Sequence, residues 1–247
     1  MIVTGTQAMH NLHYWMCRSQ TTFRKQIAVL REVIENRLLP SFSAIEEEAD
    51  AISEETWGRL EAAGGPDSDP GMAAQTAIDA GVMHYLAMRD AQQGLLNLFS
   101  VALYHMMEQQ MVIILRQELN PKGDRKSWNL CEFVKRLIQM DIKVKDFTSW
   151  AAIRELRLVA NVTKHGEGWS AQNLRQHCPE IFTPHSIKEM VDHPFLKGPQ
   201  AWLFQPLAGE DLYVTIDDLQ RYFDAADKFW QEFADALSVK ARQDGTL

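Results

Sequence analysis

The chain has 247 residues, of which 46% are hydrophobic and 23% are charged, so it can bury a substantial core in one large or two small domains. This composition excludes a chain that is disordered throughout. The net charge of −8 at pH 7 argues against a surface that is basic everywhere, although a local patch of lysine and arginine would still bind phosphate.

Three cysteines, Cys17, Cys131 and Cys178, are scattered without the paired spacing of a disulfide framework. The sequence shows neither a secretory signal pattern nor a run of about 18 uninterrupted apolar residues. We therefore expect a cytoplasmic location and no membrane partner.

Helical periodicity dominates the chain and predicts an all-α fold. Residues 21–39 repeat apolar side chains at helical intervals and are stopped by Pro40. Residues 43–63 predict an acidic, weakly amphipathic helix, which the turn-forming run 64–71 ends. Residues 1–65 are therefore expected to form an N-terminal helical extension.

A helical bundle is predicted over residues 72–247. It begins with one long or once-broken helix at 72–119, which contains no proline and has Gly81 and Gly94 as candidate kink points. Two shorter helices are expected to follow this long one.

The first of these shorter helices is predicted at 128–140 and the second at 147–165, with Gly166 as its C-terminal stop. The apolar positions expected to face the core are Leu130, Phe133, Val134, Leu137 and Ile138 on the first helix, and Trp150, Ile153, Leu156, Val159 and Ala160 on the second.

Periodicity weakens over residues 167–211, where five prolines predict an irregular insertion with one short helix at 170–177. The last helix is expected to open with an N-cap at Thr215 and acidic residues in its first turn. Its inward positions are Leu219, Tyr222, Phe223, Ala226, Phe229, Trp230, Phe233 and Leu237.

Arg157, Asn161 and His165 follow one another at four-residue intervals on the predicted helix 147–165. Each such step turns only about 40°, so the three form a polar stripe roughly 12 Å long on an otherwise apolar helix. An arginine fork matches a phosphate, an amide orients an oxygen, and an imidazole at the negative end of a helix can hold and donate a proton. The stripe therefore suits phosphodiester cleavage.

A structural interpretation of the same stripe is also open. His165 and Lys164 would then complement the C-terminal carbonyls of the helix, while Arg157 would pair with a carboxylate on another helix. His105 and Glu108, at i and i+3 on the long helix, share a face and are candidates either to contact the stripe or to form a structural pair.

Further basic residues, Lys122, Arg125, Lys126, Lys135 and Arg136, cluster near Trp128 and suit either an RNA backbone or a solvated helix edge. No phosphate-binding glycine loop or nucleophile elbow is present. The ligand types in the insertion, His177, Cys178, His185 and His193, match no standard zinc spacing. We therefore expect neither a metal nor a cofactor.

The order of these elements resembles the HEPN superfamily: a long helix, a second helix, and a helix with an arginine followed by Asn-x-x-x-His near the end of a small bundle. The resemblance covers residues 72–165 and the last helix. Position by position, Arg157 takes the place of the family arginine, Asn161 of the polar residue and His165 of the family histidine. Seven residues separate Arg157 from His165, which is more than the family's usual interval.

The resemblance implies a metal-independent endoribonuclease that acts as a homodimer. A ribose 2′-hydroxyl would attack the adjacent phosphorus, with His165 as general acid or base, Arg157 stabilising the non-bridging oxygens and Asn161 positioning groups. Substrate contacts are expected from Lys164, His105 and Glu108. Family members of this type serve in toxin or phage-defence systems, so RNA and an antitoxin or regulatory protein are the expected partners. The alternative is a catalytically inactive helical module that binds RNA or a protein as a dimer.

Overall fold

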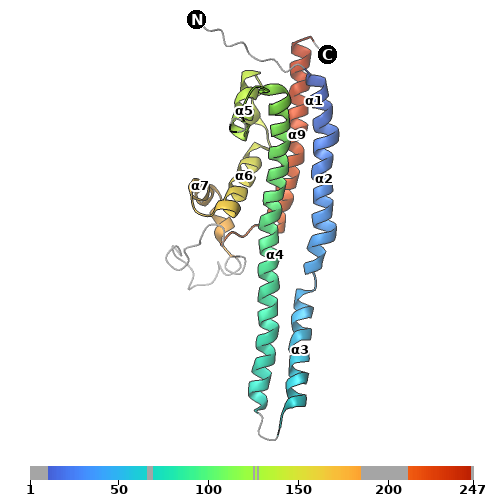
Figure 1. The fold of residues 1–247 in the computed structure, drawn as a ribbon, viewed down its shortest axis with the longest axis vertical. Coiled ribbons are helices and arrows are strands. Elements are labelled where there is room, and N and C mark those ends of the chain that lie inside the picture. Colours follow the sequence, from blue (N-terminus) through green and yellow to red (C-terminus); the bar gives the residue numbers. More distant parts are fainter. Residues whose placement is uncertain (1–10, 66–68, 125, 127, 185–210, 246–247) are drawn as a thin grey trace. The chain divides into compact units, whose positions relative to one another are not determined.

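The computed structural model describes residues 11–65, 69–124, 126, 128–184 and 211–245. Every regular element assigned in these ranges is a helix, so the protein is all-α (Figure 1). The chain forms two compact units, Met1–Arg31 with Asn97–Leu247, and Glu32–Leu96. This division differs from the expected one near residues 65–72, because the N-terminal helix α1 (Leu12–Arg18) packs on the last helix, α9 (Ile216–Gln243).

The first helical run begins at Leu12, earlier than the expected residue 21. Asn11 caps it, since its side chain accepts a hydrogen bond of 2.9 Å from the backbone N–H of Tyr14. Regular helix ends at Leu38, and Pro40 lies in the 3₁₀ turn that follows. The elements of the run are α1, a π-helical segment Ser19–Phe23, α2 (Arg24–Val33), a second π-helical segment Ile34–Leu38 and the 3₁₀ turn Leu39–Phe42.

Helix α9 supplies the apolar centre of the first unit. All eight of its predicted inward residues are buried, and its predicted N-cap is present as a capping box between Thr215 and Asp218. The ring of Trp230 packs edge-on against Phe229 and Phe233.

Helix α4 (Pro70–Ile114) continues through a π-helical segment to Leu119, which confirms the long helix predicted at 72–119. Neither candidate glycine interrupts it. From Asn97 onward its buried residues recur on one face of the helix and pack in the core of the first unit; they include Leu103, Met107, Met111 and Ile114.

By length and composition, the helix Pro70–Leu119 is also the one candidate membrane span among the described residues, with an 18-residue window of mean hydropathy 1.3. This measure alone is weak, because core helices of helical bundles meet it too. The exposed side of the helix carries His105, Gln109 and Arg116, which are costly groups to place in lipid. The pattern is that of a helix with one face in a protein core.

The helices predicted at 128–140, 147–165 and 170–177 are present as α5 (Leu130–Gln139), α6 (Trp150–His165) and α7 (Trp169–His177). Gly166 ends α6 with a φ of 67°, a left-handed conformation that suits glycine. Residues 185–210 of the predicted insertion lie outside the described residues. Leu212 is anchored to the core by α4, because the side-chain amide of Asn97 donates to the carbonyl of Leu212 at 2.7 Å.

The second unit is a hairpin of α3 (Ile45–Ala63) and the first part of α4, which run antiparallel (Figure 1). The two helices lie close together at Gly81. A Cβ atom at this position would lie 2.6 Å from the carbonyl oxygen of Ala49 and closer still to the hydroxyl of Ser53. By contrast, a Cβ atom at Gly94 would meet nothing within 4 Å.

We expect Gly81→Ala to destabilise the hairpin by about 1–3 kcal/mol, because the added methyl group forces two backbones apart. Gly94→Ala in the same helix should instead stabilise it by up to about 1 kcal/mol, through helix propensity alone. Hydrogen exchange of the α3 amides measures both effects. Equal exchange rates in the two variants would contradict the close contact at Gly81.

Candidate functional site

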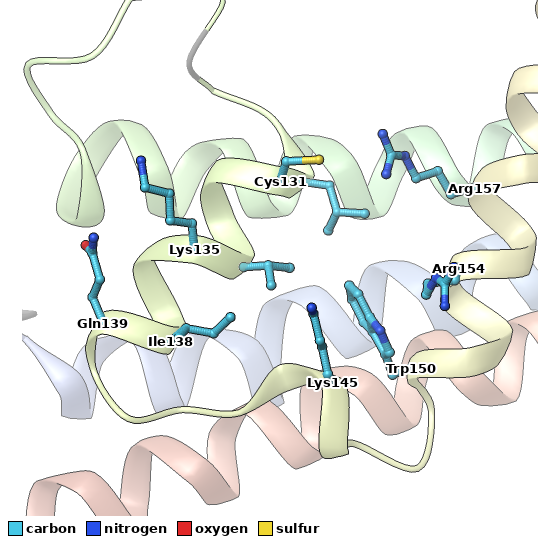
Figure 2. A pocket seen from close by; sticks show the side chains of 10 residues that line it. Cys131, Lys135, Ile138, Gln139, Lys145, Trp150, Arg154 and Arg157 are labelled. Carbon is cyan, nitrogen blue, oxygen red and sulfur yellow. The ribbon is translucent and has the colours of Figure 1, made fainter. Parts of the chain in front are cut away.

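A pocket of about 440 Å³ lies between α5 and α6 in the first unit (Figure 2). It combines an apolar wall with four basic side chains, and none of its described lining residues is a carboxylate. The lining residues are Leu130, Cys131, Val134, Lys135, Ile138, Gln139, Lys145, Trp150, Arg154 and Arg157.

The spacing of residues along both helices builds this pocket. Each helix contributes a stripe at positions i, i+4 and i+7, which share one helix face. The stripes are Cys131, Lys135 and Ile138 on α5, and Trp150, Arg154 and Arg157 on α6. Lys145 joins them from the 3₁₀ turn Val144–Asp146 between the two helices.

Three of the four pocket cations form no ion pair with another described residue. Lys135 lies 3.4 Å from Glu132, which Arg136 also binds at 2.6 Å. Across the described ranges of the chain, no ion pair is found for Lys145, Arg154 or Arg157. Like charges around one cavity repel each other, and a bound anion would relieve that repulsion.

Glu232 of α9 holds the N-terminal end of α6. Its carboxylate accepts hydrogen bonds from the backbone N–H and hydroxyl of Thr148, at 2.8 and 2.6 Å, and from those of Ser149, at 3.2 and 2.7 Å. Partial burial pushes the pKa of Glu232 upward, but these four bonds outweigh it and leave the pKa below its ordinary value. The carboxylate therefore caps α6 from a neighbouring helix.

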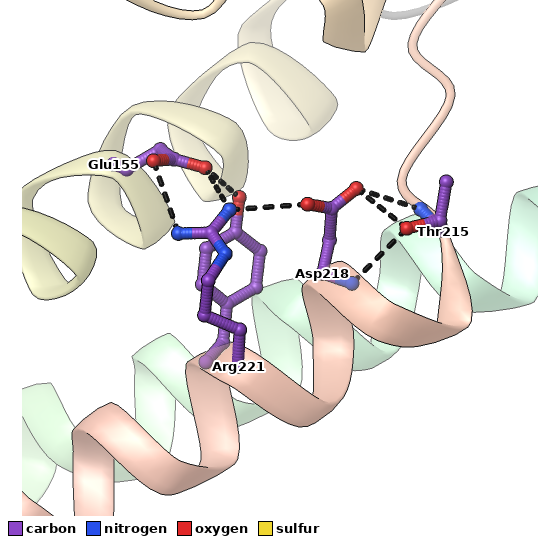
Figure 3. Close-up of polar contacts among 5 residues, drawn as sticks. Glu155, Thr215, Asp218 and Arg221 are labelled. Atoms are coloured by element: carbon purple, nitrogen blue, oxygen red, sulfur yellow. Dashed lines mark hydrogen bonds and ion pairs between the residues drawn. The ribbon is translucent and has the colours of Figure 1, made fainter.

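A second contact between α9 and α6 lies nearly two turns further along, at Glu155 (Figure 3). Its carboxylate accepts bonds from the guanidinium of Arg221, at 2.5 and 3.2 Å, and from the hydroxyl of Tyr222 at 2.6 Å. Arg221 also reaches Asp218 at 3.1 Å. Burial, together with the charge of Glu155, raises the pKa of Tyr222 well above its usual range, so the phenol stays a donor.

Arg157 also acts on a buried residue behind the pocket. Burial and the charge of Glu108 raise the pKa of Tyr104 on α4, while Arg157 opposes this rise. Glu108 and Arg157 thus act on the same phenol in opposite directions. His105 is exposed and lies 3.8 Å from Glu108, with which it forms a local pair on α4.

The structure does not gather the predicted catalytic stripe into one pocket. Only Arg157 lines it. The side-chain amide of Asn161 donates instead to the hydroxyl of Ser170 on α7, at 3.4 Å. Lys164 and His165 are exposed at the C-terminal end of α6.

Sequence reasoning missed the second stripe that passes through Arg157. Trp150 was expected in the core, but it is only partly buried, and Ile138 is 47% exposed. Both line the pocket because the core side of each helix is filled by other residues. The available signal was the i, i+4, i+7 spacing of Trp150, Arg154 and Arg157.

The predicted basic cluster near Trp128 is divided in the structure. Lys135 and Arg136 bind Glu132, and Arg125 lies outside the described residues. The guanidinium of Arg116, in the π-helical segment that follows α4, instead lies 5.1 Å from the ring centre of Trp128. These two residues and Glu108 line a separate hollow of about 530 Å³.

Within the described residues, no group of three or more histidine, cysteine or acidic side chains could hold a metal ion. His185 and His193 lie outside them. Burial and the neighbouring Glu155 raise the pKa of Cys178 to about 12, so its thiol is protonated at neutral pH.

No family model, curated protein or solved structure matches the chain. Its function is therefore inferred from the pocket itself.

We expect Glu232→Gln to lower the free energy of unfolding by about 1 kcal/mol at pH 7, because charged hydrogen bonds become neutral ones. The folded pKa of Glu232 is depressed, so its contribution is fully present above the unfolded value of about 4.3 and is lost as the pH falls through the folded value. Urea unfolding at pH 7 and below pH 4 should show the difference from wild type closing in acid. Glu180→Gln, at an exposed position, should show no such difference at pH 7.

Proposed function

We propose that the pocket between α5 and α6 binds one nucleotide of a single-stranded RNA. The observation that carries this proposal is a set of three cations, Lys145, Arg154 and Arg157, that surround an apolar wall containing Trp150 and are unpaired among the described residues. Guanidinium groups match phosphate oxygens, and an aromatic face stacks on a base of any sequence.

The size of the pocket supports a single nucleotide. A volume of about 440 Å³ lies within the range of small-ligand sites. A duplex would instead be recognised across a wide groove by a broad surface. The pocket thus favours a splayed base with its phosphate.

The charge distribution supports the same proposal. The hairpin Glu32–Leu96 contains 13 acidic and three basic residues, whereas the rest of the chain contains 20 acidic and 22 basic residues. The net charge of −8 therefore arises in the hairpin. The unit that holds the pocket carries a slight positive balance, which does not oppose the approach of a polyanion.

Metal-independent endoribonuclease activity of the HEPN type is the second candidate, and the exposure of His165 beside Lys164 favours it. A 2′-hydroxyl would lose its proton to water as its oxygen attacks phosphorus, the 5′-oxygen would leave with a proton from His165, and a 2′,3′-cyclic phosphate would remain. Arg157 lies about 12 Å from His165 along α6, so a shared phosphate would need a strand along the helix or a second copy of the chain. The cytoplasmic location, the homodimer and an antitoxin or regulatory partner belong to this candidate.

The binding proposal predicts that Arg154→Gln/Arg157→Gln weakens binding of a fluorescein-labelled oligouridine by about tenfold or more, because two phosphate contacts are lost. The slope of log affinity against log salt should fall by about 1.4, since each contact on a single strand contributes roughly 0.7. Lys25→Gln/Lys228→Gln removes the same charge from exposed positions outside the pocket and should change affinity less than twofold.

A second measurement tests where on the protein the RNA binds. Cys131 lines the pocket, whereas Cys17 is exposed on α1 outside it. Bound RNA should slow iodoacetamide labelling of Cys131 and leave Cys17 unchanged. Two results would reject the pocket as the site. One is an equal loss of affinity in the pocket and control variants, and the other is an equal effect of RNA on the labelling rates of Cys131 and Cys17.

The cleavage candidate predicts that the protein cuts a mixed RNA pool in EDTA and leaves 2′,3′-cyclic phosphate ends. His165→Ala and Arg157→Ala should each abolish cutting while retaining the helical circular dichroism spectrum. His13→Ala, at another exposed histidine, should cut as wild type does. RNA binding without cutting by the folded wild-type protein would leave the binding proposal standing and remove this candidate.

A further inference from the structure

The hairpin Glu32–Leu96 has a groove of its own, of about 400 Å³, between α3 and α4. Its floor is formed where Gly81 lets the two helices approach closely, beside Ala49 and Ser53. Its described lining residues include two carboxylates and no lysine or arginine. The lining residues are Glu46, Ala49, Asp50, Ser53, Ile78, Gly81, Val82 and Tyr85.

Large apolar side chains follow the edge of this groove. Ile78 is 54% exposed, Val82 49% and Leu86 51%, and their four-residue spacing places them in one row along α4. Within the hairpin, the contact at Gly81 buries mainly small side chains, such as Ala49 and Ala77. The row is therefore not covered by the hairpin itself, and its spacing is that of a surface on which a third helix lies.

The charge of the hairpin limits what can cover the row. With 13 acidic residues, three arginines and no lysine, two copies of the hairpin would repel each other if they met face to face. A helix with lysine or arginine on either side of an apolar stripe would instead complement Glu46 and Asp50.

We propose that this groove binds a basic amphipathic helix of a partner protein, with the partner's apolar anchors packed against Ile78 and Val82. The basic residues that flank those anchors face Glu46 and Asp50. This site is independent of the RNA pocket, because every residue that lines it belongs to the hairpin.

The probe for this proposal is a fluorescein-labelled 18-residue peptide of leucine and lysine in an amphipathic helical pattern. Its matched control replaces every lysine with glutamate. The full-length protein should raise the fluorescence anisotropy of the lysine peptide and not of the glutamate peptide. Binding of both peptides alike would overturn the basic character of the partner.

Two pairs of variants test the location. Ile78→Ser/Val82→Ser should weaken binding by about tenfold, because central apolar anchors dominate such interfaces. Met72→Ser/Met83→Ser changes two methionines of the same helix, 70% and 67% exposed, that lie outside the groove. This control should have less than a twofold effect.

Glu46→Gln/Asp50→Asn should weaken binding more than Glu47→Gln/Glu55→Gln, which removes equal charge elsewhere on α3. Equal losses within either pair would overturn the groove as the site.

Discussion

The candidate site depends on how α9 holds α6. Glu232 binds the N-terminal end of α6, and Arg221 with Tyr222 binds Glu155 nearly two turns later. Two contacts at different positions along a helix fix both the location of the helix and its rotation about its own axis. The face with Trp150 is consequently held toward α5, and the repulsion among the pocket cations cannot be relieved by turning the helix away.

The two units carry surfaces of opposite charge. The first unit gathers unpaired cations around an apolar wall, as far as the described residues extend, while the hairpin surrounds an apolar groove with carboxylates. A net charge averaged over the chain conceals both features. The acidity of the whole protein is thus a property of residues 32–96 and carries no information about the pocket.

The sequence predicted what depends on periodicity and caps, and it failed where distant segments meet. The buried face of α9 and the long helix α4 were predicted correctly, since each follows from its own pattern. Arg157, however, belongs to two stripes on α6, one with Asn161 and His165 and the other with Trp150 and Arg154. Only the position of α5 decides which stripe lines a pocket. Likewise, α1 belongs to the first unit because α9, at the other end of the chain, covers it.

The two stripes would also separate the proposed binding from the proposed cleavage in space. A phosphate bound inside the pocket would contact Arg157, whereas His165 lies about two turns further along α6, beyond Asn161 and outside the pocket lining. The bond from Asn161 to Ser170 is long, at 3.4 Å, and is therefore a weak attachment for the residue between them. A phosphate shared by Arg157 and His165 of one chain would have to leave the pocket and lie along the exposed end of the helix. The proposed binding in the pocket would therefore need one copy of the protein, while the candidate cleavage of a phosphate held there would need a histidine from a second copy.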